Sequence, residues 1–392
     1  MVKTLELKST VNERPFFNEE HYQYQKALRK FLEKEAEPYF EQWEKDGMIP
    51  RDFWKKVGEN GFLAQWVEEE YGGMGVDFGF SVIMAEEFEK VGSGLIGFST
   101  HSDVVGPYLD SFATEKQKEK YLSKFSSGEM ISAIAISEPG AGSDLANIKT
   151  TAIKEDDHYI LNGSKTFITN GVQADVYVLA CKTNPHAEPV HKGISILIVD
   201  RDTPGVEVTR KLDKVGMRSS DTAELYFDNA RIPVENLLGE EGKGFTYLMD
   251  KLQQERLLTA ITALAAAEDM LQTTLSYVQE RKAFGRPISK FQNTQFQLVE
   301  IATKVKIART FLDDLIVKHI EEKNIVTEVS MAKYWITEMA REVSNTCMQL
   351  HGGYGYMEEY KIARRFRDIP VYSIFAGTNE IMKNIIAKNI GL

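Results

Sequence analysis

The sequence predicts an α+β protein of three domains, in which two helical regions flank a region of β-strands. Apolar residues recur at helical spacing over residues 1–130 and again over residues 239–392. Between them, residues 131–238 contain short β-rich runs bounded by turn residues, with no helical pattern between the runs. Strands without intervening helices do not build a Rossmann unit, so we expect a mostly antiparallel barrel or sandwich as the middle domain.

The N-terminal domain is expected to be all-helical. Residues 22–47 show the i, i+3, i+4 apolar rhythm of one helix that ends at Gly47. The stretches DFWKKVGENGFL and FGFSVIMAEEFEKVG repeat this pattern, and glycine-rich segments join them.

The middle and C-terminal domains differ in the spacing of their apolar residues. The middle domain is expected to contain five strand runs: ISAIAIS, HYILNGSKTFITN, DVYVLACKT, GISILIVD and TAELYFDNARI. In the C-terminal domain, long helices are expected over 242–281, 292–322 and 327–351, with a last one after Thr378. These lengths exceed the usual mean, which favours a four-helix bundle that also packs against other subunits.

Composition excludes several classes of protein. With 392 residues, 43% hydrophobic and 27% charged, the chain is typical of globular proteins. The net charge of −11 argues against a nucleic-acid partner, because binding phosphates requires a basic face. The two cysteines, Cys181 and Cys347, indicate neither a disulfide framework nor a thiolate metal site, and the seven histidines show no metal-binding spacing.

The location expected from the sequence is the cytoplasm, without a membrane span. The N-terminal stretch MVKTLELKSTVNERPFF resembles neither a secretory signal nor a transit peptide. The most apolar stretch, residues 257–267, is too short to cross a bilayer.

Two motifs in the β region suggest a flat or anionic ligand. In AIAISEPGAGSD (133–144), Gly140 and Gly142 let the backbone approach a phosphate or a ring edge, although a plain turn is the more frequent explanation of such a motif alone. In TFITN (166–170), Phe167 and Thr169 share one strand face and could flank a planar heterocycle. Ordinary half-buried strand residues are the alternative.

Two helix ends carry further candidates. In RKAFGRP (281–287), Arg281 could neutralise a pyrophosphate and Phe284 could stack on a purine, and a Gly/Pro C-cap is an equally good explanation. In QLHGGYGY (349–356), three glycines exceed what a C-cap needs and permit a ligand or second chain to approach the backbone.

The last pair of motifs concerns catalysis. In SIFAGTNEIM (373–382), Thr378 is expected to be an N-cap, and the helix start suits an anion or a carbonyl oxygen, whereas Ala376 has no reactive group. In KLQQERLL (251–258), Glu255 interrupts an apolar helix face between Leu252 and Leu258. It is either part of a solvated stripe or a buried carboxylate with a raised pKa, and hence a candidate base.

Together these motifs, in this order and spacing, resemble the acyl-CoA dehydrogenase family along essentially the whole chain, and the QER helix and FAGTNEIM end most resemble the long-chain subgroup. The resemblance implies a homotetrameric flavoprotein that binds FAD. It implies an oxidoreductase that dehydrogenates a saturated, medium- to long-chain acyl-CoA to trans-2-enoyl-CoA in fatty-acid β-oxidation. The electrons would pass to an electron-transfer flavoprotein.

The resemblance also implies site residues. The cofactor contacts are Ile134, Ile136, Ser137 and Ser143 beside the flavin and pantetheine, Phe167 and Thr169 at the isoalloxazine, Arg281, Phe284 and Gln292 at the pyrophosphate and adenosine, Gln349, Gly352 and Gly353 at the FAD of a neighbouring subunit, and Thr378 and Glu380 at the phosphate and ribose. The acyl-CoA contacts are Ser143, Gln253, Arg256, Gly377 and Lys388.

One difference from the commonest family pattern identifies the expected catalytic base. Many family members have a glutamate where this chain has Ala376, whereas long-chain and isovaleryl types place the base on the earlier helix, at the position of Glu255. We therefore expect Glu255 to take the α-proton. Ala376 would donate its backbone N–H to the thioester oxygen, with the FAD 2′-hydroxyl as second donor.

Two alternatives remain open from the sequence. One is an acyl-CoA oxidase or flavin monooxygenase on the same scaffold, and the other is a catalytically inactive FAD- or CoA-binding assembly protein. The small residues of 93–102 could leave a deep acyl tunnel, but the sequence does not define the preferred chain length.

Overall fold

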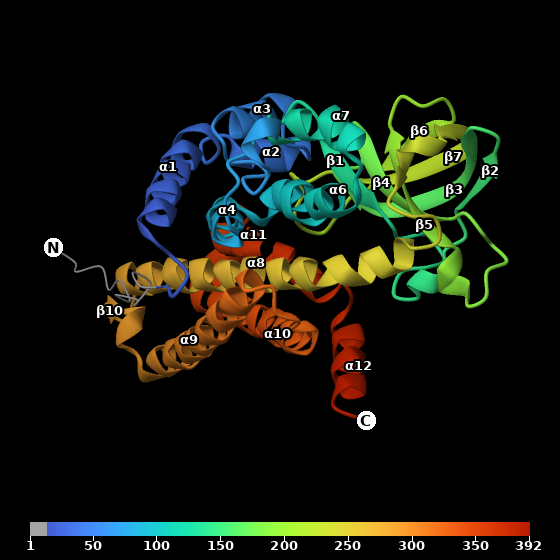
Figure 1. The fold of residues 1–392 in the computed structure, drawn as a ribbon. Helices are drawn as coiled ribbons and strands as arrows, with labels where there is room; N and C mark the ends of the chain where they lie inside the picture. Colours follow the sequence, from blue (N-terminus) through green and yellow to red (C-terminus); the bar gives the residue numbers. More distant parts are fainter. Residues whose placement is uncertain (1–13) are drawn as a thin grey trace.

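The computed structural model describes residues 14–392. The N-terminal helices and the β-sheet lie side by side along one long helix, α8 (Gly244–Glu280), and the helices α9 (Gln292–Ile320), α10 (Val326–His351) and α12 (Asn379–Asn389) lie on its other side (Figure 1). Residues 1–13 lie outside the described residues, and they include the start of the expected N-terminal domain and most of the stretch considered for targeting signals.

The N-terminal region is helical, as predicted. Its helices are α1 (Glu19–Glu35), α2 (Phe40–Asp46), α3 (Arg51–Glu59), α4 (Phe78–Val91), α5 (Ile96–Ser99), α6 (Gly106–Phe112) and α7 (Glu115–Ser126), with one π-helical turn, η4 (Thr100–Val105), between α5 and α6. The prediction of a single helix over 22–47 is wrong, because the chain breaks between α1 and α2. Pro38 lies in the break and lacks a backbone N–H, and it disfavours helical geometry at Glu37. The predicted end at Gly47 is confirmed, with φ of 68°.

The middle region is one curled sheet of eight strands. They are β1 (Ser132–Ala135), β2 (Thr151–Glu155), β3 (His158–Thr169), β4 (Val176–Lys182), β5 (Ile194–Asp200), β6 (Val206–Lys211), β7 (Thr222–Pro233) and β8 (Leu237–Leu238). Their order is β6-β7-β3-β2-β4-β5-β8, with β1 joined to β4. Most pairs are antiparallel, as predicted, but β1 and β2 each pair with β4 in parallel.

The sheet is buried on both faces at β4 and β5, whereas β2, β6 and β7 each expose one face. On one face, β4 and β5 pack through Val178 and Ile196 against Tyr108 of α6 and Phe125 of α7. Residues of the opposite face form a separate apolar cluster around Leu179. The sheet is therefore anchored to the N-terminal helices, and the loop after β1 is carried on a rigid base.

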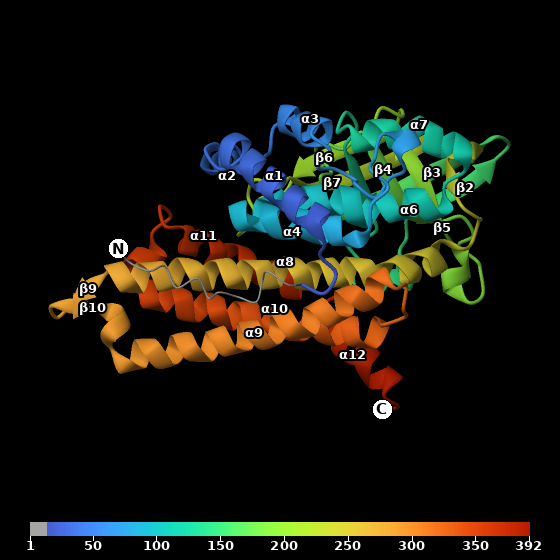
Figure 2. The same cartoon turned by 60° about the vertical axis from the view of Figure 1, so that its left-hand side comes forward.

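Three long helices make up most of the C-terminal region. They are α8, α9 (Gln292–Ile320) and α10 (Val326–His351), followed by the shorter α11 (Lys361–Asp368) and α12 (Asn379–Asn389). The bounds agree with the expected ranges to within two residues, because the apolar spacing that defines each helix is also what its core requires. The last helix, α12, points away from the other C-terminal helices (Figure 2). Among residues 14–392, no helix has the length and apolar character needed to cross a bilayer.

The segment after α8 differs from its predicted form. The helix ends at Glu280, and residues 282–287 form a β-hairpin of β9 (Lys282–Ala283) and β10 (Arg286–Pro287) instead of a Gly/Pro cap. Phe284 and Gly285 form the tip with φ of 50° and 79°, as in two-residue hairpin turns. The hairpin projects beyond the ends of α8 and α9 (Figure 2).

Candidate active site

Glu255 lies on α8 where the helix passes from partly exposed to fully buried surroundings. Residues 251–255 are half-buried, whereas every residue from Arg256 to Ala267 is buried. Burial raises the pKa of the Glu255 carboxyl, and the positive charges of Arg256 and Lys333 oppose this shift. The structure therefore supports a partly desolvated carboxylate on this face, as expected for a base, and not a solvated stripe.

Two cations accompany this carboxylate. Arg256 is buried, and its Nε has no hydrogen-bond partner within the described part of the chain. Lys333, on α10, is fully buried, and burial together with the charge of Arg256 lowers the pKa of its ammonium to about 8. We call Glu255, Arg256 and Lys333 the Glu255 cluster. Lys333 was not predicted from the sequence, since a lysine in a helix is most often solvated and nothing local indicates its burial.

The turn before α12 meets the same cluster. Ala376 and Gly377 both have left-handed backbone geometry, with φ of 55° and 84°. The Gly377 carbonyl accepts a hydrogen bond of 2.6 Å from Lys333 Nζ, which links the turn to the cluster. The predicted N-cap at Thr378 is confirmed, because its Oγ1 accepts from the Ile381 N–H at 3.3 Å.

The loop after β1 is held by a second buried lysine. Lys165 is fully buried on β3 and donates to the Ile136 carbonyl and to Glu138 Oε1, both at 2.8 Å. Glu138 also accepts from the backbone N–H groups of Lys149 and Thr150. This arrangement fixes Ile136, and Ser137 follows it on the same loop. Neither Lys165 nor Glu138 was predicted as a site residue, although a charged residue inside a strand run was a visible signal.

The two β-region motifs lie next to each other. The Thr166 N–H donates to the Ser137 carbonyl at 3.0 Å, so β3 adjoins the loop after β1. The register of β3 shifts between Lys165 and Ile168, and Phe167 sits in this bulge with φ of 61° and 71% of its surface exposed. Thr169 is half-buried two residues further on. The exposed ring of Phe167 and the open backbone at Gly140 and Gly142 suit a flat ligand.

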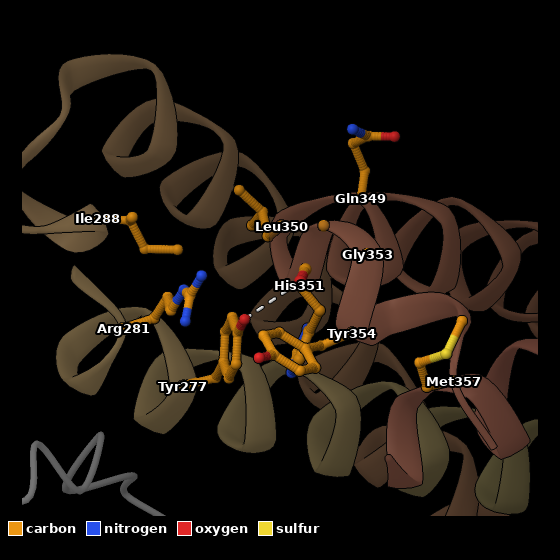
Figure 3. A pocket seen from close by; sticks show the side chains of 10 residues that line it. Tyr277, Arg281, Ile288, Gln349, Leu350, His351, Gly353, Tyr354 and Met357 are labelled. Carbon is orange, nitrogen blue, oxygen red and sulfur yellow. Dashed lines mark hydrogen bonds between the residues drawn. The ribbon is translucent and has the colours of Figure 1, made fainter. Parts of the chain in front are cut away.

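A second region of predicted site residues lies at the far end of α8. Arg281, Gln349, Gly352 and Gly353 line a cavity of ≈ 580 Å³, together with Tyr277, Ile288, Leu350, His351, Tyr354 and Met357 (Figure 3). The Tyr277 hydroxyl donates to the His351 carbonyl at 3.1 Å and ties α8 to the end of α10. Added Cβ atoms at Gly352 and Gly353 would meet nothing within 4 Å, so this backbone is open to a ligand.

Five other predicted contacts lie at the edges of these regions. Phe284 is 94% exposed at the hairpin tip, and Gln292 is exposed at the start of α9. Ser143 is exposed in the loop after β1, and Ile134 is half-buried within β1. Glu380 is exposed in the first turn of α12, where a backbone hydrogen bond and then Thr378 lower the pKa of its carboxyl.

The predicted acyl-CoA contacts differ in how free they are. The Gln253 side chain accepts from Ile325 N–H at 2.9 Å and donates to the Lys323 carbonyl at 3.1 Å, so it holds the connection between α9 and α10. Lys388 is exposed in the last turn of α12. Contact of these residues with acyl-CoA stays a prediction.

The residues present fit FAD as a cofactor. Phe167 and Phe284 offer exposed aromatic faces, Gly352 and Gly353 offer open backbone, and Arg281 offers an exposed cation beside them. Within residues 14–392 no group of three or more His, Cys, Asp or Glu side chains could hold a metal ion.

Comparisons with known proteins agree with this arrangement. Three family models match the chain: the N-terminal domain of acyl-CoA dehydrogenases over residues 18–129, the middle domain over 133–230 and the C-terminal domain over 242–391. The long-chain specific acyl-CoA dehydrogenase of Rattus norvegicus mitochondria is 43% identical over 96% of this chain and 88% of its own length. A crystal structure of an acyl-CoA dehydrogenase from Geobacillus kaustophilus has a TM-score of 0.96 at 60% identity, covering 97% of this chain and all of that one (100%). A glutaryl-CoA dehydrogenase from Mycobacterium smegmatis in complex with FADH2 has a TM-score of 0.91 at 27% identity, with coverage of 99% and 98%.

The helix–sheet–helix fold and these matches define a flavin-dependent oxidoreductase that acts on CH–CH groups. The chain belongs to the acyl-CoA dehydrogenase family, and FAD is its cofactor.

Proposed function

We propose that this enzyme oxidises a saturated medium- to long-chain acyl-CoA to the trans-2-enoyl-CoA in fatty-acid β-oxidation, with Glu255 as the base. One observation carries the proposal: Glu255 is a half-buried carboxylate with a raised pKa, at the point where α8, α10 and the turn before α12 converge. The 43% identity with a long-chain specific relative supports the chain-length class.

The reaction removes one proton and one hydride from adjacent carbons. Glu255 takes the α-proton onto a carboxylate oxygen, and the positive charges of Arg256 and Lys333 keep that carboxylate available for it. The Ala376 N–H donates to the thioester oxygen, where negative charge develops as the proton leaves. FAD, when bound, supplies the acceptor for the β-hydrogen and its electron pair.

The small side chain of Ala376 is consistent with this division of roles. A base anchored on α8 needs room at the α-carbon, and a methyl group at position 376 leaves that room. The donor in the turn is a backbone group, so it does not depend on the side chain. The absence of a glutamate at position 376 therefore does not imply an inactive protein.

The two groups of cofactor residues support an oligomer. Glu255 and Arg281 are 26 residues apart on α8, which corresponds to about 39 Å along a straight helix. The cavity that Arg281 lines is therefore remote from the proposed base. Since Arg281 lines the same cavity as Gln349, Gly352 and Gly353, we assign both sets to the FAD of a neighbouring subunit. We propose that the assembly is the homotetramer expected from the family.

The other predicted site residues are assigned to the cofactor in the same proposal. Phe167, Thr169, Ile134, Ile136, Ser137 and Ser143 would contact the flavin, and Thr378 and Glu380 would contact the phosphate and ribose. The reduced cofactor would pass electrons to an electron-transfer flavoprotein in the cytoplasm.

The direct test is flavin bleaching without oxygen. We expect the purified protein to be yellow, and a saturated acyl-CoA to bleach its flavin band anaerobically. A panel from short to long chains, plus isovaleryl-CoA, should give its highest kcat/KM with a medium- or long-chain thioester. A maximum for a short or branched substrate would overturn the chain-length class alone, and a lack of bleaching with every thioester would overturn the proposed reaction.

The same assay separates the acyl-CoA oxidase alternative. After bleaching, the reduced enzyme is mixed with air-saturated buffer or with an electron-transfer flavoprotein. A dehydrogenase should be reoxidised much faster by the flavoprotein. Faster reoxidation by oxygen, with formation of H₂O₂, would favour the oxidase.

A further inference from the structure

Lys333 is an unusual residue for the middle of a helix core. It is 0% exposed and is flanked on α10 by the buried residues Ala332 and Ile336. A buried ammonium group is costly unless it is fully hydrogen-bonded, so its partners reveal its role. Those partners are Gly377 and Asn379, which belong to the segment that leads into α12.

These contacts attach the turn to α10. Lys333 Nζ donates to the Gly377 carbonyl at 2.6 Å and to Asn379 Oδ1 at 3.2 Å. Asn379 is itself buried, and its amide donates to Thr337 Oγ1 at 3.1 Å and to the Tyr334 carbonyl at 3.3 Å. The segment that includes the Ala376 N–H is therefore held by hydrogen bonds from one face of α10.

The turn needs such a restraint. Ala376 adopts a left-handed conformation that is unfavourable for an L-residue, and Gly377 has the largest backbone freedom of any residue. Strained turns persist where the surrounding structure determines them. The bond from Lys333 fixes the peptide plane that follows Gly377, and this limits rotation at the residue next to the Ala376 donor.

The ammonium also interacts electrostatically with the expected base. Of the charged groups around Lys333, Glu255 and Arg256 come from α8 and Glu380 from α12. Around Glu255, the cations are Arg256 and Lys333, while the Tyr108 hydroxyl faces it from α6 without a hydrogen-bond partner in the described structure. Among residues 14–392, Lys333 is thus the cation that both hydrogen-bonds the turn and acts on the base.

We infer that Lys333 is a positioning residue for the dehydrogenation: it orients the turn that presents the Ala376 N–H. This inference rests on the proposed function, because it assumes Glu255 as base and Ala376 N–H as donor. Its positive charge is a supporting effect on the same step, because it opposes the rise that burial causes in the pKa of the Glu255 carboxyl.

The test is Lys333→Met, which keeps the length of the side chain and removes its charge and donors. We expect the anaerobic rate of flavin reduction at saturating acyl-CoA to fall about 10²-fold, as for a slight misplacement of reacting groups, with a smaller change in KM. The acid limb of the rate–pH profile should move to higher pH, because Glu255 loses a neighbouring positive charge. The alkaline limb near pH 8, where Lys333 loses its proton, should disappear.

Two control variants distinguish the positioning of the turn from the effect of the Lys333 charge. Lys383→Met removes an exposed lysine that also joins α12 to α10, through Glu338 at 2.8 Å, and should leave the rate and the pH profile unchanged. Thr337→Val weakens the hold on Asn379 without removing a charge, so the rate should fall while the acid limb stays in place.

A second substitution, Lys333→Arg, tests the inference even if Lys333→Met folds poorly. Lys333→Arg retains the charge but not the same hydrogen-bond geometry, so we expect a lower rate with an unmoved acid limb, and flavin content and melting temperature report its folding. A wild-type rate and pH profile in either substitution at Lys333 would overturn the inference. If Glu255→Gln remains fully active, the proposed function fails instead, whatever Lys333 does.

Discussion

Two clusters of buried charge differ in how completely they are hydrogen-bonded. We call Arg365, Glu89 and Asp269 the Arg365 cluster. Arg365 donates to Asp269 Oδ2 at 2.9 Å and to Glu89 Oε1 at 2.5 Å. Glu89 Oε2 accepts from the Tyr372 hydroxyl at 2.7 Å. In the Glu255 cluster, by contrast, Arg256 Nε is unpartnered, and no donor among residues 14–392 hydrogen-bonds the Glu255 carboxylate.

This difference in hydrogen bonding distinguishes a structural charge cluster from a catalytic one. The Arg365 cluster joins α4, α8 and α11, and its groups satisfy one another, so it stabilises the packing of the N-terminal helices on the C-terminal ones. The Glu255 cluster leaves groups unsatisfied where a substrate is expected. Buried polar groups are normally paired, so an unpaired group needs an explanation such as a ligand or a role in catalysis.

Removing the base should have the largest effect. Glu255→Gln keeps the shape of the side chain but cannot accept the α-proton, so flavin reduction should slow by about 10⁴-fold, the upper range for a general base. Bound FAD should be retained, as measured by its absorbance. Asp250→Asn is the control, because Asp250 lies on the same helix with an exposed side chain beside Lys251, and it should be nearly as active as the parent.

A substitution in the Arg365 cluster should lower the stability of the protein and leave the rate per active site unchanged. Arg365→Met leaves the buried Glu89 carboxylate without its cation and Asp269 with Lys361 as its remaining cation, and we expect the free energy of unfolding to fall by about 3–5 kcal/mol. Arg210→Met removes an exposed pair with Glu224 and should cost about 0–1 kcal/mol. Urea denaturation measures both. Equal losses in the two variants would contradict the distinction between the clusters.

Much of this architecture was predictable from local patterns. Helical and strand periods located α8, α9, α10 and the β-rich middle region, because the same spacing that is visible in the sequence forms the core. The break at Pro38 was visible too, but it was outweighed by the continuous apolar rhythm around it. The parallel pairing of β1 with β4 was not predictable, since it depends on how a distant strand enters the sheet.

The candidate site was predictable only in part. Glu255, Ala376 and Thr378 are visible in short motifs, whereas Lys333 is not, because its acceptor lies 44 residues away at Gly377. Likewise, Arg281 and Gln349 come together because two helix ends meet, and neither motif contains information about the other.

The smallest expected effect concerns Asp368, an unsatisfied carboxyl outside the proposed active site. Its Oδ1 accepts from the Met217 N–H at 2.6 Å, its Oδ2 has no partner in the described chain, and burial raises the pKa of this carboxyl to about 7. Between the ordinary pKa of aspartate and pH 7, the folded state therefore holds a proton that the unfolded chain has lost, and stability decreases as the pH rises through this range.

Asp368→Asn should remove that dependence. The amide keeps an acceptor for Met217 and carries no charge, so we expect a gain of about 1–2 kcal/mol at pH 8 and little change at pH 4, from urea denaturation at both values. Asp228→Asn, at an exposed site on β7, should keep the parent's pH dependence. If Asp368→Asn loses activity while its stability is unchanged, this carboxyl belongs with the Glu255 cluster. If the Asp368→Asn variant is stabilised and active, this carboxyl is not part of the chemistry. An unpaired buried group then indicates a catalytic role only where it also faces a site that a substrate can enter.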